Sequence, residues 1–158
     1  MITLDQAQIR ARLPHTGDMC LLRAVSGCDA RGIRCVADSH RLAANPLRTA
    51  AGLGAANAVE YAAQAMALHA MLQQPDRPQG KGEPAAHGML ASVRRLVLHR
   101  PRLDDLVDDL SIRAVPVSLD GQGALYEFDV RCAGQAVAEG RAIVLFPARQ
   151  AVDGIGVP

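Results

Sequence analysis

The sequence predicts an α+β fold in which one long, buried helix is covered by an antiparallel β-sheet. An alanine-rich stretch runs from about Ala50 to Gln73, and residues 53–68 within it carry a single charge, that of Glu60. A helix that is apolar on all sides is expected to be buried. Strand-like segments follow this stretch, and a helix followed by an antiparallel meander is typical of a two-layer domain.

Before the long helix, the sequence predicts a short helix and a hairpin. Residues 4–12 are amphipathic, with Thr3 as a suitable N-cap and Pro14 as a stop signal. Residues 19–25 and 32–37 are apolar enough for two strands, and a polar turn separates them. A loop then leads into the long helix.

After the long helix, the sequence predicts an exposed loop and four strands. Residues 74–88 are dense in Pro, Gly and charge, which is typical of a loop. Apolar and polar residues alternate over 126–132, the period of a half-buried strand. We expect a single domain with its core at about 8–147, a frayed tail at 148–158, and strands at 89–99, 108–118, 123–132 and 136–146.

Composition excludes several classes of protein. A chain of 158 residues is most simply one domain. A net charge of +1 gives no electrostatic reason to expect nucleic acid or a membrane surface as a partner. No apolar run reaches the ~20 residues of a membrane span, and the amino terminus lacks the pattern of a signal peptide, so a cytoplasmic protein is expected. The four cysteines lack zinc-binding spacing, so no metal is expected.

Glu60 is the first candidate for a functional residue. A carboxylate in an apolar helix loses hydration, which costs roughly several kcal/mol unless the group is paired. Asn57 and Gln64 lie three residues before and four residues after Glu60, so all three share one helix face. A carboxyl group in this setting is expected to have a chemical task.

Two motifs resemble the β-hydroxyacyl-acyl-carrier-protein dehydratases of the hotdog fold. Residues 13–22, Leu-Pro-His-Thr-Gly-Asp-Met-Cys-Leu-Leu, resemble the Leu-Pro-His-Arg…Leu-Leu segment that opens these enzymes. Residues 60–65, Glu-Tyr-Ala-Ala-Gln-Ala, resemble their Glu-x-x-Ala-Gln-Ala helix motif. The Thr-Gly-Asp-Met variant and Gly-Met-Leu at 88–90 look most like the branch found in bacterial aryl-polyene lipid clusters. The resemblance implies a single hotdog domain.

The resemblance also implies an activity: a (3R)-hydroxyacyl-carrier-protein dehydratase of fatty acid or polyene lipid biosynthesis, without metal or organic cofactor. Glu60 would be its general acid. The family's usual catalytic histidine lies fourteen residues before this glutamate, where the chain has Pro46. His15, inside the matched motif, is the first candidate for the missing base, although it could only shape the fold or tunnel. His40 is the rival, and its plainer interpretation is an exposed loop residue.

The backbone at the helix start is expected to bind the thioester. An N–H group near Gly54 or Ala55, aided by the helix dipole, would hold the enolate-like oxygen. Gly54 would let the thioester approach closely. Asn57 would bind Glu60 or substrate, or would satisfy backbone at a dimer contact. Gln64 would position Glu60 or hold a loop carbonyl.

Two alternatives stay open at the level of sequence. An acyl thioesterase of the same fold could use Glu60 to activate water. A catalytically degenerate subunit could instead stabilise an active dehydratase in a heteromeric complex. The expected partners are an acyl carrier protein or coenzyme A thioester and a second subunit, which would form a homodimer, a higher homo-oligomer or a heterodimer with a related chain.

Overall fold

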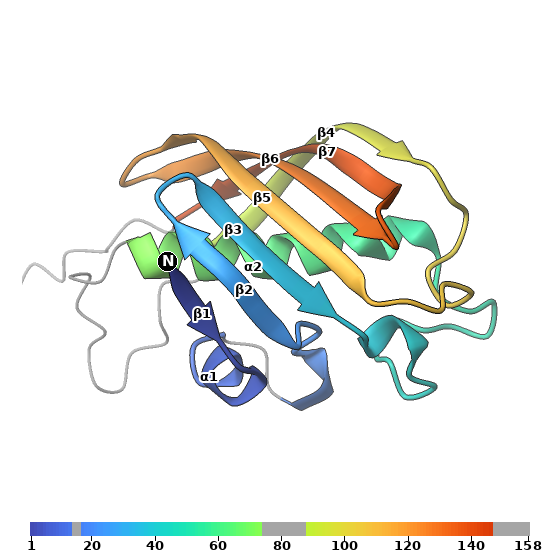
Figure 1. The fold of residues 1–158 in the computed structure, drawn as a ribbon. Coiled ribbons are helices and arrows are strands. Elements are labelled where there is room, and N and C mark those ends of the chain that lie inside the picture. Colours follow the sequence, from blue (N-terminus) through green and yellow to red (C-terminus); the bar gives the residue numbers. More distant parts are fainter. Residues whose placement is uncertain (14–16, 74–87, 147–158) are drawn as a thin grey trace, which may run out of the picture.

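A seven-stranded antiparallel sheet curves around one long helix (Figure 1). The computed structural model describes residues 1–13, 17–73 and 88–146. The predictions for His15, the 74–87 loop and the 148–158 tail therefore lie outside the described residues. The elements are β1 (Ile2–Leu4), α1 (Gln6–Arg10), β2 (Ala24–Asp29), β3 (Gly32–Ala37), α2 (Ala58–Gln73), β4 (Met89–Leu98), β5 (Leu110–Leu119), β6 (Gly123–Cys132) and β7 (Gln135–Leu145). The predicted α+β hotdog class is confirmed.

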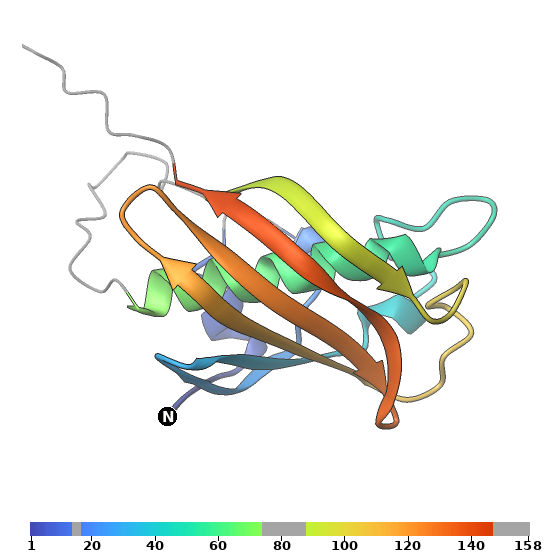
Figure 2. The ribbon, with the colours of Figure 1, turned by 90° about the horizontal axis from the view of Figure 1, so that it is seen from above.

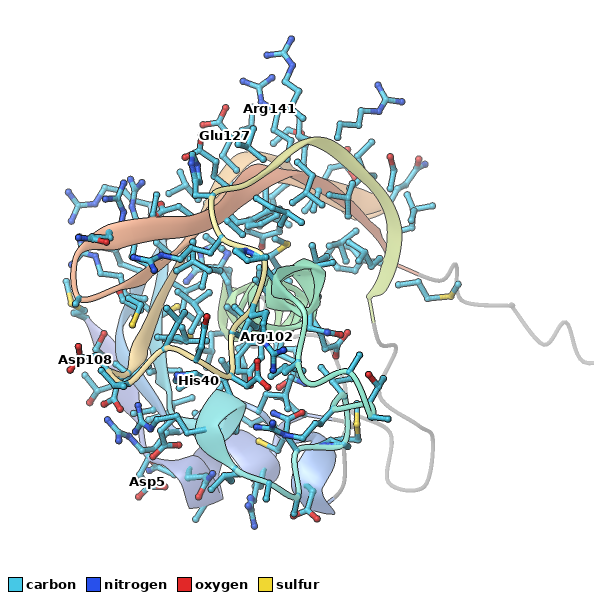
Figure 3. All side chains as sticks on the ribbon, turned by 90° about the vertical axis from the view of Figure 1, so that its right-hand side faces the viewer. Asp5, His40, Arg102, Asp108, Glu127 and Arg141 are labelled. Carbon is cyan, nitrogen blue, oxygen red and sulfur yellow. The ribbon has the colours of Figure 1, made fainter. Side chains whose placement is uncertain are left out.

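The sheet has the strand order β1-β2-β3-β5-β6-β7-β4, with every neighbouring pair antiparallel. Helix α2 crosses one face of this sheet and contacts β2, β3, β5, β6 and β7 (Figures 1 and 2). Viewed from the side, the sheet bends around the helix, while Glu127 and Arg141 point outward from its other face (Figure 3). The core therefore lies between α2 and the inward-facing residues of β2, β3, β5, β6 and β7.

The amino-terminal elements differ from the sequence prediction. The first helix begins at Gln6, and its N-cap is Asp5 rather than Thr3. Asp5 Oδ1 accepts a hydrogen bond from the Gln8 amide at 2.9 Å, and Gln8 Oε1 accepts one from the Asp5 amide at 2.9 Å. This reciprocal capping box satisfies two free helix-end donors. Thr3 instead lies in β1, a short strand that the sequence did not predict.

The apolar run that predicted a strand at 19–25 is buried but mostly not a strand. Gly17–Met19 form a turn of 3₁₀ helix, and β2 begins only at Ala24. Cys20, Leu21 and Leu22 are buried in irregular backbone between them. The Met19 carbonyl and the Leu21 amide are bound by a side chain of α2 rather than by a neighbouring strand, so burial was predicted correctly and backbone conformation was not.

The long helix also begins later than predicted. Ala55–Asn57 form a 3₁₀ turn, and α2 proper starts at Ala58. The preceding residues turn sharply, because Thr49 and Gly52 exchange two backbone hydrogen bonds of 3.0 and 2.9 Å. Gly52 has a φ of +97°, and a Cβ atom there would overlap the guanidinium of Arg102. Only glycine fits this position without rearrangement.

Two further sequence predictions concern the described residues. The four cysteines are free thiols and buried, as expected for small apolar core residues. In the described ranges, no helix is long and apolar enough to cross a membrane.

Candidate active site

Gln64 connects the helix carboxylate to residues 19–21, the second half of the 13–22 motif. This side chain is only 1% exposed. Its Nε2 donates to the Met19 carbonyl at 2.7 Å and to Glu60 Oε1 at 3.2 Å, and its Oε1 accepts from the Leu21 amide at 2.9 Å. One buried amide group thus holds Glu60 and the 19–21 backbone together. Gln64 thus makes both of the contacts that the sequence offered as alternatives, one to Glu60 and one to a loop carbonyl.

Glu60 is half-buried rather than buried in the single chain. The expectation of a fully buried helix was wrong in this respect, because α2 leaves one stripe uncovered. That stripe contains Ala56, which is exposed, and the half-buried Val59, Ala63 and Ala67, at helical spacing. Glu60 therefore belongs to a partly exposed stripe of α2, and Gln64 donates a hydrogen bond to one oxygen of its carboxylate.

His40 is fully buried, so its interpretation as an exposed loop residue was wrong. It lies in a 3₁₀ turn, Ser39–Arg41, packed under the 103–109 segment. Neither ring nitrogen has a hydrogen-bond partner in the described part of the chain, and the carbonyls of Leu106 and Asp108 face the ring without meeting hydrogen-bond geometry. Burial, with a smaller contribution from the charge of Arg41, lowers the pKa of His40.

The loop that carries His40 is bound to Tyr61 of α2, whereas residues 19–21 are bound to Gln64. Ser39 Oγ lies 2.8 Å from the Tyr61 hydroxyl, and Asn45 Nδ2 donates to the same hydroxyl at 3.1 Å. Tyr61 and Glu60 are consecutive and project about 100° apart around a helix. Ser39 Oγ also donates to the Leu21 carbonyl at 2.9 Å, so the His40 loop contacts both Tyr61 of α2 and the 19–21 backbone that Gln64 binds.

At the helix start, the Ala55 amide donates to the Pro101 carbonyl at 3.0 Å, so this amide is already used. Gly54 forms an antiparallel bridge with Arg102. The Ala55–Pro101 hydrogen bond lies on one side of this bridge. On the other side, the Leu103 amide donates to the Leu53 carbonyl at 2.9 Å. In such a pair the Gly54 amide points away from the neighbouring strand. Among the described residues, neither Gly54 nor Ala56 donates its amide to an acceptor.

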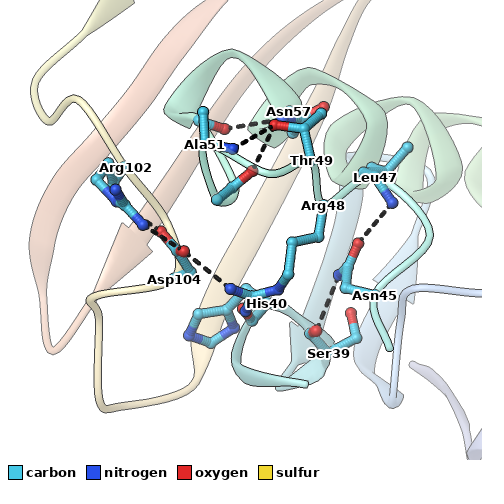
Figure 4. A network of polar contacts seen from close by, with 12 residues as sticks. Ser39, His40, Asn45, Leu47, Arg48, Thr49, Ala51, Asn57, Arg102 and Asp104 are labelled. Carbon is cyan, nitrogen blue, oxygen red and sulfur yellow. Dashed lines mark hydrogen bonds and ion pairs between the residues drawn. The ribbon is translucent and has the colours of Figure 1, made fainter. Parts of the chain in front are cut away.

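Two further details describe this helix start. The space beside the Gly54 Cα is open, since a Cβ there would meet no atom within 4 Å. The half-buried Asn57 donates from Nδ2 to the Gly54 carbonyl at 3.1 Å, so its described partner is the helix-start backbone rather than Glu60 (Figure 4). Glu60 lies four residues, about one helical turn, after Ala56 and six residues after Gly54.

A family model described as ApeP dehydratase matches residues 7–153. The chain belongs to the ApeP-like dehydratase family. No curated protein sequence matches it at a significant level.

Solved structures similar to this ApeP-like chain share its fold. The dehydratase heterocomplex ApeI:P from Xenorhabdus doucetiae matches with a TM-score of 0.75 and 24% identity, over 89% of this chain and 91% of that chain. A thioesterase from Haemophilus influenzae matches with a TM-score of 0.61 and 12% identity, over 95% of each chain. A hypothetical thioesterase with coenzyme A from Streptococcus pneumoniae has a TM-score of 0.53 and 11% identity, over 78% of this chain and 84% of that chain.

An ionic cluster that the sequence did not reveal lies beside the helix start of the ApeP-like chain. The carboxylate of Asp104 is held by two arginines, Arg48 and Arg102 (Figure 4). Because Asp104 is one of four aspartates between 104 and 109, no local pattern distinguished it. In the described ranges, no group of three His, Cys, Asp or Glu side chains is arranged to hold a metal ion.

The buried histidines predict that acid destabilises the protein. Burial lowers the pKa of His69 as well as that of His40, and His69 lies between the Tyr126 hydroxyl and the Asp29 carbonyl, at 2.8 and 2.9 Å. In the unfolded chain both rings regain an ordinary pKa of about 6.5. The unfolded state therefore binds more protons as the pH falls through about 6.5, and stability present above this pH is lost below it.

The measurement is urea unfolding at about pH 7.5 and about pH 5.5 for the wild type and His40→Gln. The variant lacks one of the two titrating rings, so its stability should fall less on acidification, by up to about 1.4 kcal/mol per pH unit. Equal losses in the two proteins would show that His40 does not titrate differently in the folded and unfolded states.

Proposed function

We propose that this ApeP-like protein eliminates water from a (3R)-3-hydroxyacyl thioester and yields a trans-2-enoyl thioester. The observation that carries the proposal is the half-buried Glu60, whose carboxyl accepts a hydrogen bond from Gln64 and which lies six residues after Gly54, where the helix start is open. Membership of a dehydratase family supports the reaction class. The thioester is carried by an acyl carrier protein or by coenzyme A.

Elimination requires a base, an oxyanion donor and an acid. The base removes a proton from the carbon next to the thioester carbonyl, and we assign this step to His15. The negative charge moves to the carbonyl oxygen. As the carbon–carbon double bond forms, Glu60 gives its proton to the hydroxyl group on the next carbon, which leaves as water.

The oxyanion is assigned to the helix-start amides of Gly54 and Ala56 rather than to that of Ala55. These two amides have no acceptor among the described residues, whereas the Ala55 amide is bound to Pro101. The positive end of the helix dipole favours a negative oxygen at this position. Open space beside the Gly54 Cα gives the thioester room to approach.

The test is formation of the enoyl product from 3-hydroxyacyl thioesters of several chain lengths, presented on coenzyme A and on a carrier protein. Loss of a general acid typically costs about 10²–10⁴-fold in rate, so Glu60→Gln should lower kcat by about that factor. Glu127→Gln is the matched control, because this half-exposed carboxylate on β6 pairs with Arg141 on the face of the sheet that points away from α2 (Figure 3). Its activity should equal that of the wild type.

Three other results would contradict parts of the assignment. A His15→Ala variant that keeps full activity would remove His15 as the base and make His40 the next residue to substitute. Release of free thiol from simple acyl thioesters, without enoyl product, would make the protein a thioesterase. A wild type that is inert alone but required for the activity of a second hotdog subunit would make it a degenerate subunit.

We also propose that β4 is the edge at which a second hotdog subunit binds. Among the described strands, β4 has one neighbour, β7, and no described strand pairs with its other edge. Leu96, Val97 and Leu98 are consecutive and exposed by 39, 44 and 43%, so apolar side chains on both faces of the strand are uncovered. Exposed apolar edge strands are prone to pair with another chain. The uncovered stripe of α2 adds to the apolar surface available to a partner.

The occupant we propose is a second copy of this chain, and light scattering on the purified protein should therefore give a dimer. Leu96→Glu should shift the equilibrium toward monomer, because it places a charge in the interface. Val117→Glu changes an exposed valine on β5, an interior strand of the sheet, and should leave the dimer intact. A monomeric wild type would contradict the homodimer and direct the search to a related subunit.

A further inference from the structure

Asp104 is the centre of the ionic cluster beside the helix start. Its side chain is only 5% exposed. Arg102 binds it through two contacts, Nε to Oδ1 at 2.9 Å and Nη2 to Oδ2 at 2.6 Å, and Arg48 Nη1 binds Oδ2 at 2.9 Å. Arg102, followed by the backbone amides of Leu53 and Asp104 itself, keeps the pKa of this carboxyl low, at about 2. The carboxylate is therefore charged at every pH at which the protein would be assayed.

These contacts converge on the turn that presents the helix-start amides. Arg48 lies before the turn, and its Nη2 also donates to the His40 carbonyl at 3.3 Å. Gly52 packs so closely against Arg102 and Asp104 that a methyl group does not fit between them. On either side of the Gly54–Arg102 bridge, backbone hydrogen bonds join this turn to residues 101–103. The turn is thus held by ionic contacts on the Gly52 side and by backbone contacts around Gly54.

We propose that Asp104 is a positioning residue: it holds the 52–55 turn so that the Gly54 and Ala56 amides stay aimed at the thioester oxygen. This inference rests on the proposed dehydratase function. Asp104 does not touch substrate in this account. It acts through Arg102, Gly52 and the Leu53 amide. Arg48 and Arg102 compensate the negative charge of Asp104, so that this charge does not oppose a developing oxyanion.

The consequence is a specific kinetic effect. Displacement of a catalytic group by about 1 Å costs on the order of 10²-fold in rate. An interaction that serves only the transition state lowers kcat and kcat/KM together and leaves KM nearly unchanged. Loss of the Asp104 charge should therefore reduce kcat, with little effect on binding of the substrate or of the enoyl product.

The experiment compares Asp104→Asn with Asp105→Asn in the full-length protein. Both variants remove one negative charge from adjacent positions, but Asp105 is exposed and forms no ion pair with a described residue. With all proteins assayed well below their melting temperatures, Asp104→Asn should show kcat lower by about 10–10²-fold and an unchanged KM. Asp105→Asn should match the wild type in both constants.

A second variant keeps the proposal testable if Asp104→Asn does not fold. Arg102 is about half exposed, and Arg102→Lys keeps its charge while losing the two-point contact with Asp104. It should lower kcat in the same direction by a smaller factor. An unchanged kcat in folded Asp104→Asn, or in Arg102→Lys, would overturn the proposal. So would a loss that only follows the fraction of folded protein.

Failure of the proposed function gives a different result. In that case the wild type and Asp105→Asn form no enoyl product either. If only the positioning role of Asp104 is wrong, the wild type is active and loses activity in Glu60→Gln, whereas Asp104→Asn is as active as the wild type.

Discussion

The rest of the site depends on the buried amide of Gln64. A buried amide is costly unless its donors and acceptor are satisfied, and Gln64 meets this demand with the Met19 carbonyl, the Leu21 amide and Glu60. The irregular but buried 19–22 backbone can exist because α2 provides these hydrogen bonds. The same bonds orient Glu60 toward the segment that follows His15. Folding and chemistry therefore share one set of contacts.

A second constraint acts at the amino-terminal end of α2. The helix start is held by backbone bonds to residues 101–103 and by the Asp104 carboxylate with its two arginines. Gly52 is required there by its left-handed backbone, whereas Gly54 is open on the side where a substrate would approach. The proposed acid thus lies in the first turn of α2, and the proposed oxyanion donors lie four and six residues before it, in the preceding 3₁₀ turn and its cap. Each has its own supporting contacts.

Much of the fold was predictable because it follows from local pattern. The apolar helix, the alternation in β6 and the polar turns indicated the α+β class, and the motifs at 13–22 and 60–65 indicated the family. Contacts between distant segments were not predictable in the same way. Nothing local to Asp104 distinguishes it from its acidic neighbours, and nothing local to His40 shows that the 103–109 segment covers it. The sequence also left undecided which helix-start amide is free, because Pro101 takes the Ala55 amide from more than forty residues away.

The central claim is that Gln64 makes Glu60 an effective acid by fixing its direction. The most direct test is kcat and KM for 3-hydroxyacyl thioester dehydration by Gln64→Leu, which fills similar space but makes no hydrogen bond. Gln73→Leu is the control, since that residue ends the same helix and the hydrogen bond that its side chain makes within the described residues is to Cys28 Sγ, at 3.9 Å. The account predicts a folded Gln64→Leu protein, destabilised by about 1–3 kcal/mol, with kcat lower by about tenfold or more and KM little changed. A wild-type kcat in Gln64→Leu would contradict it.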